Sequence, residues 1–383
     1  MSVETRGVYT TPQIKPNGLE TRMKKTLTTL AIAVCFATPA AYAQSNVTLY
    51  GNLDGGVAFF NNVGGKHLYT TEDGNYIPDL FGLRGNEDLG GGLHAIFNLE
   101  AGYSLSSGAL MVPNQLFSRT ALVGLKSDTA GQLTLGHQPD FMFDILSPYS
   151  TGYLAGSFYS FHQGNFDELA NTFEFNNSVK YVSPSFGGLS FGGQFGFGNA
   201  AGNFAAGRNY AFTVQYKSGA LSVGAAYANE NDRFLELANL VGLQSLLGTP
   251  LPASGIVANN VENWGVGGSY ALGNWLLHAL FTQSRISTAT AHGNANTTDF
   301  GVNYTFSPSD TLGLGVSFEN FDGGNWATLT LSNAYMLSKR TSLYQQLLFQ
   351  KASGAAAVAS LLGAGQSSTH SQVGVVIGIQ HWF

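Results

Sequence analysis

Residues 297–306 read Thr-Thr-Asp-Phe-Gly-Val-Asn-Tyr-Thr-Phe and alternate strictly between polar and apolar side chains. Successive side chains of a β-strand point to opposite faces, so this stretch predicts a strand with one apolar and one polar face. The apolar face would carry Thr298, Phe300, Val302, Tyr304 and Phe306, and the polar face Thr297, Asp299, Gly301, Asn303 and Thr305.

The same alternation recurs along the chain, as in residues 47–54, 189–198, 209–217 and 311–319. A soluble β-sandwich with its apolar faces turned inward would alternate in the same way. Two features favour a membrane barrel instead. The apolar faces carry aromatic residues near the strand ends, as an interfacial girdle does, and the polar faces are rich in Gly, Asn, Ser and Thr rather than Lys and Glu.

The pattern predicts an all-β fold, a 16-stranded antiparallel transmembrane β-barrel, and an even strand number is the rule for single-chain bacterial barrels. Short turns alternate with long loops near 138–173, 230–262 and 352–370, as they do in outer-membrane barrels. A barrel of this width leaves an aqueous channel. The expected strands are 46–58, 77–86, 91–104, 116–126, 131–137, 174–183, 188–198, 208–217, 220–229, 263–272, 274–287, 297–307, 310–320, 326–337, 341–351 and 371–383.

Composition agrees with a chain of many short alternating strands. Of the 383 residues, 44% are hydrophobic, only 10% are charged and 49 are glycine, which excludes a disordered chain. Two apolar stretches, 240–258 and 354–365, fall in long loops, and Pro250 and Pro252 interrupt the first. We expect both to pack over the mouth of the barrel.

The N-terminal region has the three parts of a secretory signal peptide. Met23-Lys24-Lys25 precedes an apolar stretch over 27–36, and Ala41-Tyr42-Ala43 forms a small-x-small cleavage site before Gln44. A membrane anchor is the alternative, but the apolar run is too short to span a bilayer. We therefore expect a signal peptide over 23–43, a barrel domain over 44–383, and an upstream extension over 1–22 that reflects a start codon assigned too early.

Removal of residues 1–43 changes the charge of the chain. The full sequence has 17 Lys+Arg and 23 Asp+Glu; losing five basic and two acidic residues leaves 12 and 21, a formal net charge of −9. Nucleic-acid-binding proteins are typically basic, so no nucleic-acid partner is expected. The one cysteine, Cys35, leaves with the signal peptide, which excludes a disulfide framework and thiol chemistry in the mature chain.

Several motifs, in their order and spacing, resemble the general porins of Gram-negative bacteria, most closely the β-proteobacterial trimeric type. The resemblance covers the whole mature chain. It implies a homotrimer in the outer membrane, in contact with its lipid, and a third loop that folds into the barrel and narrows it. The matching segments are Asn46-Val-Thr-Leu-Tyr-Gly-Asn-Leu-Asp54, Phe81-Gly-Leu-Arg-Gly-Asn-Glu-Asp-Leu-Gly90, Ser118-Arg-Thr-Ala-Leu-Val-Gly-Leu125, Leu135-Gly-His-Gln138, Asn177-Ser-Val-Lys-Tyr-Val-Ser-Pro184 and His381-Trp-Phe383.

In the family that this chain resembles, the third loop faces a ladder of basic residues on the barrel wall. The third loop here, about 138–173, carries Asp140, Asp144, Asp167 and Glu168 and no Lys or Arg. The resemblance implies that these acids form the constriction. Alternatively, several of them cap turns at a distance from the narrowest point.

The wall departs from the family pattern at three positions, where arginine is typical and this chain has Leu80, His137 and Glu174. Arg84 and Arg119 remain. Alternation places Arg84 in the lumen, and it places Glu174 there on the face of Lys180, so that Arg84, Arg119, His137, Glu174 and Lys180 are the expected wall residues. Charges in a narrow pore set its ion preference. The loss of positive wall charge predicts a mild preference for cations.

The chain ends in Phe383, after a strand that alternates through Val373, Val375, Ile377 and Ile379. A terminal aromatic residue on the last strand resembles the signal read by the outer-membrane barrel assembly machinery, which makes that machinery an expected partner. An aromatic residue at the membrane interface is the simpler reading, and the two are compatible.

The expected function is passive diffusion of ions and small hydrophilic solutes through a water-filled channel. Eight scattered histidines with no i,i+4 pair predict no metal site, and nothing marks a catalytic nucleophile or a cofactor. A surface adhesin or a barrel enzyme such as a lipid hydrolase is a more distant possibility. The main alternative is a channel selective for an aromatic or sugar-like solute, because the third loop is rich in aromatics: Phe141, Phe143, Tyr149, Tyr153, Phe158, Tyr159, Phe161 and Phe166.

Overall fold

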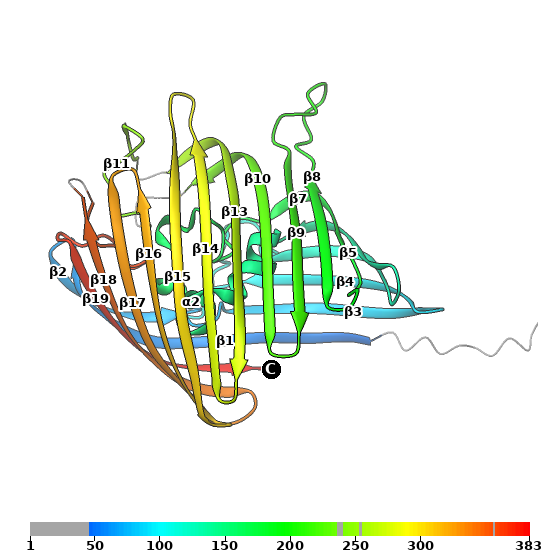
Figure 1. Ribbon diagram of the computed structural model, residues 1–383, viewed down its shortest axis with the longest axis horizontal. Coiled ribbons are helices and arrows are strands. Elements are labelled where there is room, and N and C mark those ends of the chain that lie inside the picture. Colours follow the sequence, from blue (N-terminus) through cyan, green and yellow to red (C-terminus); the bar gives the residue numbers. More distant parts are fainter. Residues whose placement is uncertain (1–45, 236–239, 253–254, 355–356) are drawn as a thin grey trace, which may run out of the picture. The chain divides into compact units, whose positions relative to one another are not determined.

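A computed structural model describes residues 46–383 except 236–239, 253–254 and 355–356. The expected signal peptide, upstream extension and cleavage site lie outside the described residues. The unit that begins at Ser45 is a closed antiparallel β-barrel (Figure 1). No helix in the described part of the chain is long and apolar enough to cross a membrane.

Seventeen strands pair into one sheet, and because β2 and β3 both pair with β1, they make sixteen positions around the ring. The ring closes where β1 pairs with β19. A separate small hairpin joins β11 (Ser245–Leu246) and β12 (Thr249–Pro250). The barrel strands are β1 (Asn46–Val63), β2 (Lys66–Asp73), β3 (Leu80–Gly90), β4 (Leu93–Gly102), β5 (Thr120–Ser127), β6 (Gly131–Gln138), β7 (Phe175–Val182), β8 (Leu189–Gly196), β9 (Asn209–Ser218), β10 (Leu221–Leu235), β13 (Ile256–Leu272), β14 (Trp275–Ser287), β15 (His292–Ser307), β16 (Asp310–Phe321), β17 (Gly324–Met336), β18 (Thr341–Ser353) and β19 (Ser371–Trp382).

The strand register lines up apolar side chains on the outer face and small or polar ones on the inner face. One row of paired outer residues crosses β14 to β19 and consists of Leu277, Val302, Leu314, Leu331, Leu347 and Val375. Most of this row is exposed in the isolated chain, as expected for side chains that face lipid. The next row points inward and consists of His278, Gly301, Gly315, Thr330, Leu348 and Gly374.

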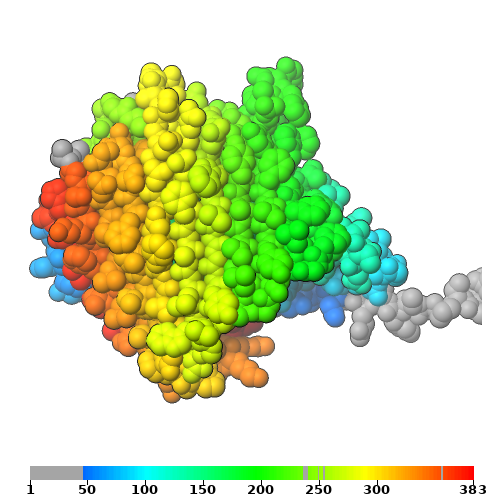
Figure 2. All heavy atoms as spheres, viewed as in Figure 1, coloured from blue at the N-terminus to red at the C-terminus, as the bar shows by residue number. Residues whose placement is uncertain are grey.

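Aromatic residues gather on the outer face near strand ends. The Trp275 ring lies 4.4 Å from that of Tyr304, which in turn lies 4.7 Å from Phe306. Trp264 packs against Phe281 nearer the other rim. The side chains of these strands form a continuous outer surface (Figure 2). For β14 to β19 the alternation in the sequence therefore predicted correctly which face of the strand turns outward.

All sixteen expected strands are present, and three details differ from the prediction. Strands β10 and β13 run to Leu235 and from Ile256, well into the expected long loop. The second strand of the barrel is split into β2 and β3 by the loop 74–79, so that β1 has two successive partners. The pairing of β6 with β7 shifts between Gly136 and Gln138, which marks a β-bulge.

The long loop between β6 and β7, residues 139–174, lies inside the ring of strands (Figure 1). Most of its side chains are buried. It is built of short helical turns rather than one helix: η1 (Met142–Leu146), η2 (Ser147–Tyr149), α2 (Thr151–Leu154), η3 (Phe158–Ser160) and η4 (Gln163–Asn165).

Glycines on the inner wall make room for this loop. A Cβ atom at Gly315 would lie 2.2 Å from side-chain atoms of Thr151, and one at Gly313 would lie 2.7 Å from the Cβ of Ala155. Side chains at these positions of β16 would push α2 away from the wall. The glycine-rich inner face is therefore a packing surface for the loop.

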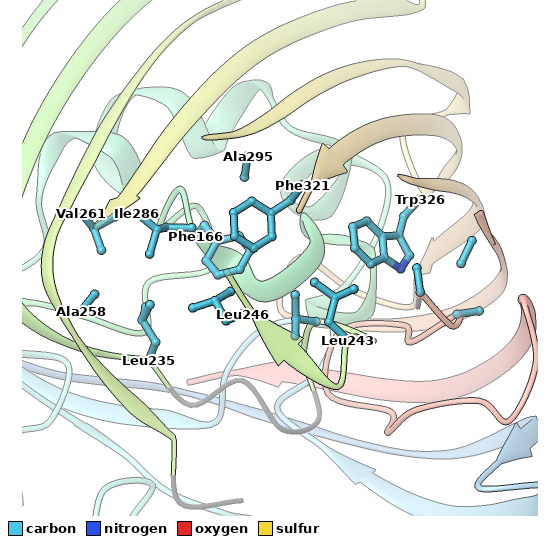
Figure 3. Packing of buried hydrophobic residues seen from close by; sticks show 14 residues of the cluster. Phe166, Leu235, Leu243, Leu246, Ala258, Val261, Ile286, Ala295, Phe321 and Trp326 are labelled. Carbon is cyan, nitrogen blue, oxygen red and sulfur yellow. The ribbon is translucent and has the colours of Figure 1, made fainter. Parts of the chain in front are cut away.

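The two apolar loop stretches pack over one side of the barrel interior, as expected. Val241, Leu243 and Leu246 are buried against Phe166 of the long loop and Trp326 of β17 (Figure 3). Ala357 and Ala359 of the last loop are buried in the same cluster, and the indole N–H of Trp326 donates to the carbonyl of Val358 at 3.0 Å. These loops cover the rim of the barrel where β10, β14, β16 and β18 end and β13, β15 and β17 begin.

Candidate functional site

The third loop is fastened to the inner wall by charged groups. Asp299 of β15 accepts hydrogen bonds from the backbone N–H of Thr151 (2.8 Å) and from its hydroxyl (2.5 Å). The His162 ring lies between two carboxylates, with Nε2 3.2 Å from Asp299 and Nδ1 2.6 Å from Asp167. The Thr282 hydroxyl also donates to Asp167 at 2.6 Å. All of these side chains are buried, and together they hold the loop against the wall. This set of contacts is hereafter called the clamp.

A second set of contacts holds the far end of the loop. Arg233 of β10 pairs with Glu168 of the loop and with Glu230 of its own strand, and it donates to the carbonyls of Phe166 (2.9 Å) and Asn165 (3.1 Å). One cation thus joins two carboxylates and two carbonyls. A buried carboxylate needs such a partner, because desolvation otherwise makes its charged form costly.

Glu319 of β16 fastens the loop between these two sets. Its carboxylate accepts from the backbone N–H of Gln163 and from the Thr297 hydroxyl, both at 2.9 Å. The side chain of Gln350 donates to the side-chain oxygen of Gln163 at 3.0 Å.

The start of the loop is held from β7. The Lys180 ammonium donates to the carbonyl of Pro139 at 2.7 Å and pairs with Asp144 at 2.5 Å, and it lies 4.6 Å from the Phe141 ring centre. Asp140 caps the following turn by accepting from the backbone N–H groups of Met142 and Phe143. Lys180 is therefore buried beneath the loop.

The electrostatics of the loop follow from burial. Burial raises the pKa of Asp140 to about 7, with a smaller contribution from nearby Glu168, whose own pKa burial also raises. Burial by itself would lower the pKa of His162, but the carboxylates of Asp167 and Asp299 raise it well above its usual value. Burial opposes ionisation of Asp167, yet His162 holds its pKa below the usual range. His162 and Asp167 thus form an ion pair at neutral pH.

The sequence predicted that the four acidic residues of the loop form the constriction. In the structure, most of them are buried instead. Asp140, Asp167 and Glu168 are each at most 3% exposed and are engaged by the loop or the wall. Only the Asp144 side chain is substantially exposed, at 39%, and it is paired with Lys180. The alternative reading, in which the acids cap turns and hold the loop, describes three of the four.

The open side of the loop carries aromatic residues. A cleft of about 360 Å³, hereafter the aromatic cleft, separates the loop from the wall near β1, β3, β4 and β19. Gly152 allows the Phe161 ring to lie flat on the loop, since a Cβ there would come within 2.6 Å of it. The loop side of the cleft consists of Phe143, Tyr153, Phe158 and Phe161, and the segment 74–78 and the wall residues Leu80, Glu100, Arg119 and Trp382 complete it.

The wall of the cleft holds one arginine and one carboxylate, and a second arginine lies outside the lining. Arg119 Nε–H donates to Glu100 Oε1 at 2.9 Å, and the hydroxyl of Tyr50 donates to Glu100 Oε2 at 2.8 Å. The Arg84 guanidinium stacks over the Tyr50 ring, 5.0 Å from its centre. The expected inward direction of Arg84 agrees with this contact, because Tyr50 lies against the inner glycine Gly82.

His137 and Glu174 lie at the junction of loop and wall rather than on a continuous lumen face. His137 Nδ1 is 2.9 Å from Asn176 Oδ1, and its Nε2 is 3.0 Å from the Ser118 carbonyl and 3.8 Å from Glu174. Burial raises the pKa of Glu174 to about 8, although Arg119 acts against the shift. Burial thus favours the protonated form of Glu174, which acts against the negative charge that the sequence predicted there.

The alternation predicted over residues 174–181 also breaks at its start. Phe175, expected on the lipid face, is fully buried against the loop residues Phe141 and Leu169. The bulge at Gly136–Gln138 and the left-handed conformation of Asn177 (φ 49°) switch the face of the strand there. Pattern alone does not reveal a bulge of this kind.

Several residues that organise the site were not singled out from sequence. Alternation correctly places Asp299 and Glu319 on the polar face, but it gives no sign that they hold the loop. His162 and Arg233 carried no recognisable signal, because their partners are distant in the chain.

Phe383 completes the ring. Its backbone N–H donates to the carbonyl of Gly51 at 3.1 Å and its carbonyl accepts from the Gly51 N–H at 3.2 Å. Its ring covers Gly51, where a Cβ would approach to 2.3 Å. The last residue thus extends the pairing of β19 with β1.

Comparison with known proteins agrees with this architecture. A family model described as Gram-negative porin matches residues 28–355. The chain is 31% identical to an outer membrane porin protein of Bordetella pertussis over 65% of this chain and 66% of that protein. It is 29% identical to outer membrane porin protein 32 of Delftia acidovorans over 94% of this chain and 100% of that one.

Among solved structures, the anion-selective porin from Comamonas acidovorans superposes with a TM-score of 0.74. That porin is 26% identical, and the match covers 89% of this chain and all of that one. The closed barrel with its polar interior and the family match over most of the sequence lead to one conclusion. The chain belongs to the Gram-negative porin family, whose members are outer-membrane β-barrel channels rather than enzymes.

Proposed function

We propose that this porin is a passive channel for ions and small hydrophilic solutes, and that solutes pass through the aromatic cleft. The observation that carries the proposal is the asymmetry of the interior. The third loop packs against the wall next to β13–β18 and the apolar loop stretches cover the rim there, whereas the cleft lies on the opposite side of the loop. The channel would select by size at this cleft.

The test of the channel is conductance by the purified, folded protein in a planar bilayer. Stepwise increases of current, one for each inserted assembly, are expected in KCl. Absence of steps from a preparation that shows barrel CD and heat-modifiable migration on gels would contradict a channel function and favour an adhesin or enzyme.

We further propose that the channel mildly prefers cations over anions. It is supported by the surplus of acidic residues and by the pairing of Arg119 and Lys180 with Glu100 and Asp144, which neutralises much of the wall's positive charge. The Comamonas porin is anion-selective, and Arg84 and Arg119 beside the cleft act in that direction, so the preference would be weak.

The zero-current potential under a KCl gradient shows whether the channel prefers cations or anions. A potential that favours K⁺ is expected, and Glu174→Arg should shift it toward chloride. A potential that favours Cl⁻ in the unaltered protein would overturn the cation preference and leave the channel function intact.

Family membership also supports assembly as a homotrimer and insertion by the barrel assembly machinery with Phe383 as part of the signal. Chemical cross-linking in outer membranes should give a ladder that ends at three subunits.

Deletion of Phe383 should lower the amount of folded barrel in cells, and an unchanged amount would argue that Phe383 is only an interfacial aromatic residue.

A further inference from the structure

The aromatic cleft has the composition of a binding site rather than of a plain hydrated opening. Four aromatic side chains of the loop, together with Tyr76 and Trp382, surround one charged pair. Tyr153 is 57% exposed, which is high for a large aromatic side chain inside a barrel. Stacking surfaces of this kind favour a planar apolar group over a hydrated ion.

Arg119 supplies free hydrogen-bond donors to the cleft. Both oxygens of Glu100 are occupied, by Arg119 Nε and by the Tyr50 hydroxyl. Asn75 already donates to Glu72. Within the described part of the chain, the only side-chain hydrogen bond of the Arg119 guanidinium is the one from Nε, so that its two terminal nitrogens are available.

The anion-binding group in the lining of the cleft is the Arg119 guanidinium. Arg84, over the Tyr50 ring, adds a second positive charge outside the lining, whereas Asp54, Glu72 and Asp79 lie behind the segment 74–78 and add negative charge. Burial raises the pKa of Glu174 and so disfavours its charged form. Arginine presents its donors as a planar fork that fits a carboxylate through two parallel hydrogen bonds.

The volume of the cleft limits the size of the ligand that it can bind. A cavity of about 150 Å³ holds a benzene molecule, so about 360 Å³ has room for one aromatic ring, a short acidic side chain and some water. The two free terminal nitrogens of Arg119 form one planar pair of donors, which fits a carboxylate better than the separate hydroxyl groups of a sugar. We propose that the aromatic cleft binds small aromatic carboxylates, with the ring on the loop aromatics and the carboxylate on Arg119.

This inference rests on the proposed channel function, because it places the site in the path of permeation. A solute held in that path reduces the ion current in a saturable way. Weak binding is required for transport, since a solute that is held tightly cannot leave the channel.

The test is titration of ion current in planar bilayers with phenylacetate as the probe. We expect saturable block in the unaltered channel, about tenfold weaker block by acetate, which lacks the ring, and similarly weaker block by benzyl alcohol, which lacks the carboxylate. Equal block by acetate and phenylacetate, or none by either, would overturn the proposal. Absence of any conductance would instead contradict the channel function.

Variants assign the block to the cleft. Arg119→Gln should weaken phenylacetate block about tenfold, and Arg119→Lys, which keeps the charge but loses the fork, should weaken it less. Phe161→Ala should weaken block by phenylacetate and leave the weak effect of acetate unchanged. Lys126→Gln, a matched loss of positive charge on β5 next to the short turn before β6, is the control and should behave as the unaltered protein.

If Arg119→Gln fails to give folded barrel on gels, Arg119→Lys and Phe161→Ala still decide the outcome. Unchanged block in both folded variants would overturn the assignment to this cleft.

Discussion

At the scale of single residues, the inner charges of this porin hold its third loop more than they face its lumen. Asp299 receives two hydrogen bonds from Thr151 and contacts His162, which binds Asp167 in turn. A buried ion pair by itself is weak support for stability, but removal of one partner leaves an uncompensated charge. Each member of the clamp should therefore matter more than its single contacts suggest.

Asp299→Asn keeps the shape of the side chain and removes its charge. It should destabilise the folded barrel by about 1–3 kcal/mol, the usual cost of impairing a buried hydrogen bond to a charged group. The midpoint of heat-modifiable migration on gels measures this, with Asp128→Asn as the control because that side chain is 68% exposed in a turn. Equal midpoints for both variants would show that the clamp contributes little.

Residue types and alternation predicted part of this site. Arg84, Arg119 and Lys180 have their contacts at the inner wall, and Asp144, expected in the constriction, pairs with Lys180 there. Their roles in the pore stay predictions. Sequence could not show that Asp140, Asp167 and Glu168 are buried, because their partners come from β10, β14 and the loop itself. The pairing of distant residues, not their identity, decides whether an acid faces water.

At the scale of elements, alternation predicts the strands well and the loop poorly. Strands have a period of two that survives in any context, so all sixteen were recognisable. Two features escaped the pattern: the bulge that turns Phe175 inward, and the split of one strand into β2 and β3. The third loop has no period, and its path depends on glycines that leave space on β16.

Gly315→Val should displace the third loop. The new side chain would occupy the space of Thr151, whose atoms lie 2.2 Å from an ideal Cβ. The barrel should still form, since valine suits a strand. Liposome swelling should show faster entry of larger sugars than through the unaltered channel.

Gly193→Val is the matched control for this change, because a Cβ there would meet only the Phe212 ring at 3.7 Å. Permeability of the Gly315 variant equal to that of the control would mean that α2 does not depend on this gap.

At the scale of the whole molecule, a lipid-facing surface, a polar interior and an acidic charge balance combine into a channel whose charge changes with pH. Burial raises the pKa of Asp79 to about 6, of Asp140 to about 7 and of Glu174 to about 8. Each group is neutral below its pKa and negative above it. The interior therefore gains negative charge between pH 5 and 9.

The cation preference should accordingly grow as pH rises. The zero-current potential under a fixed KCl gradient should move toward the K⁺ potential from pH 5 to pH 9. Glu174→Gln should behave as the unaltered protein at pH 6 and show a weaker cation preference at pH 9. A potential that is constant with pH would contradict these assignments.

On the proposed path, solutes pass between the aromatic edge of the third loop and the wall at Arg119. The most direct test places a cysteine at Tyr153, in a protein with Cys35 replaced by serine, and follows single-channel current as a charged methanethiosulfonate reagent is added. Ser185→Cys, in the short turn before β8, is the control. We predict a stepwise loss of conductance for Tyr153→Cys and little change for the control. Complete modification of Tyr153→Cys with no change in current would contradict this path through the barrel.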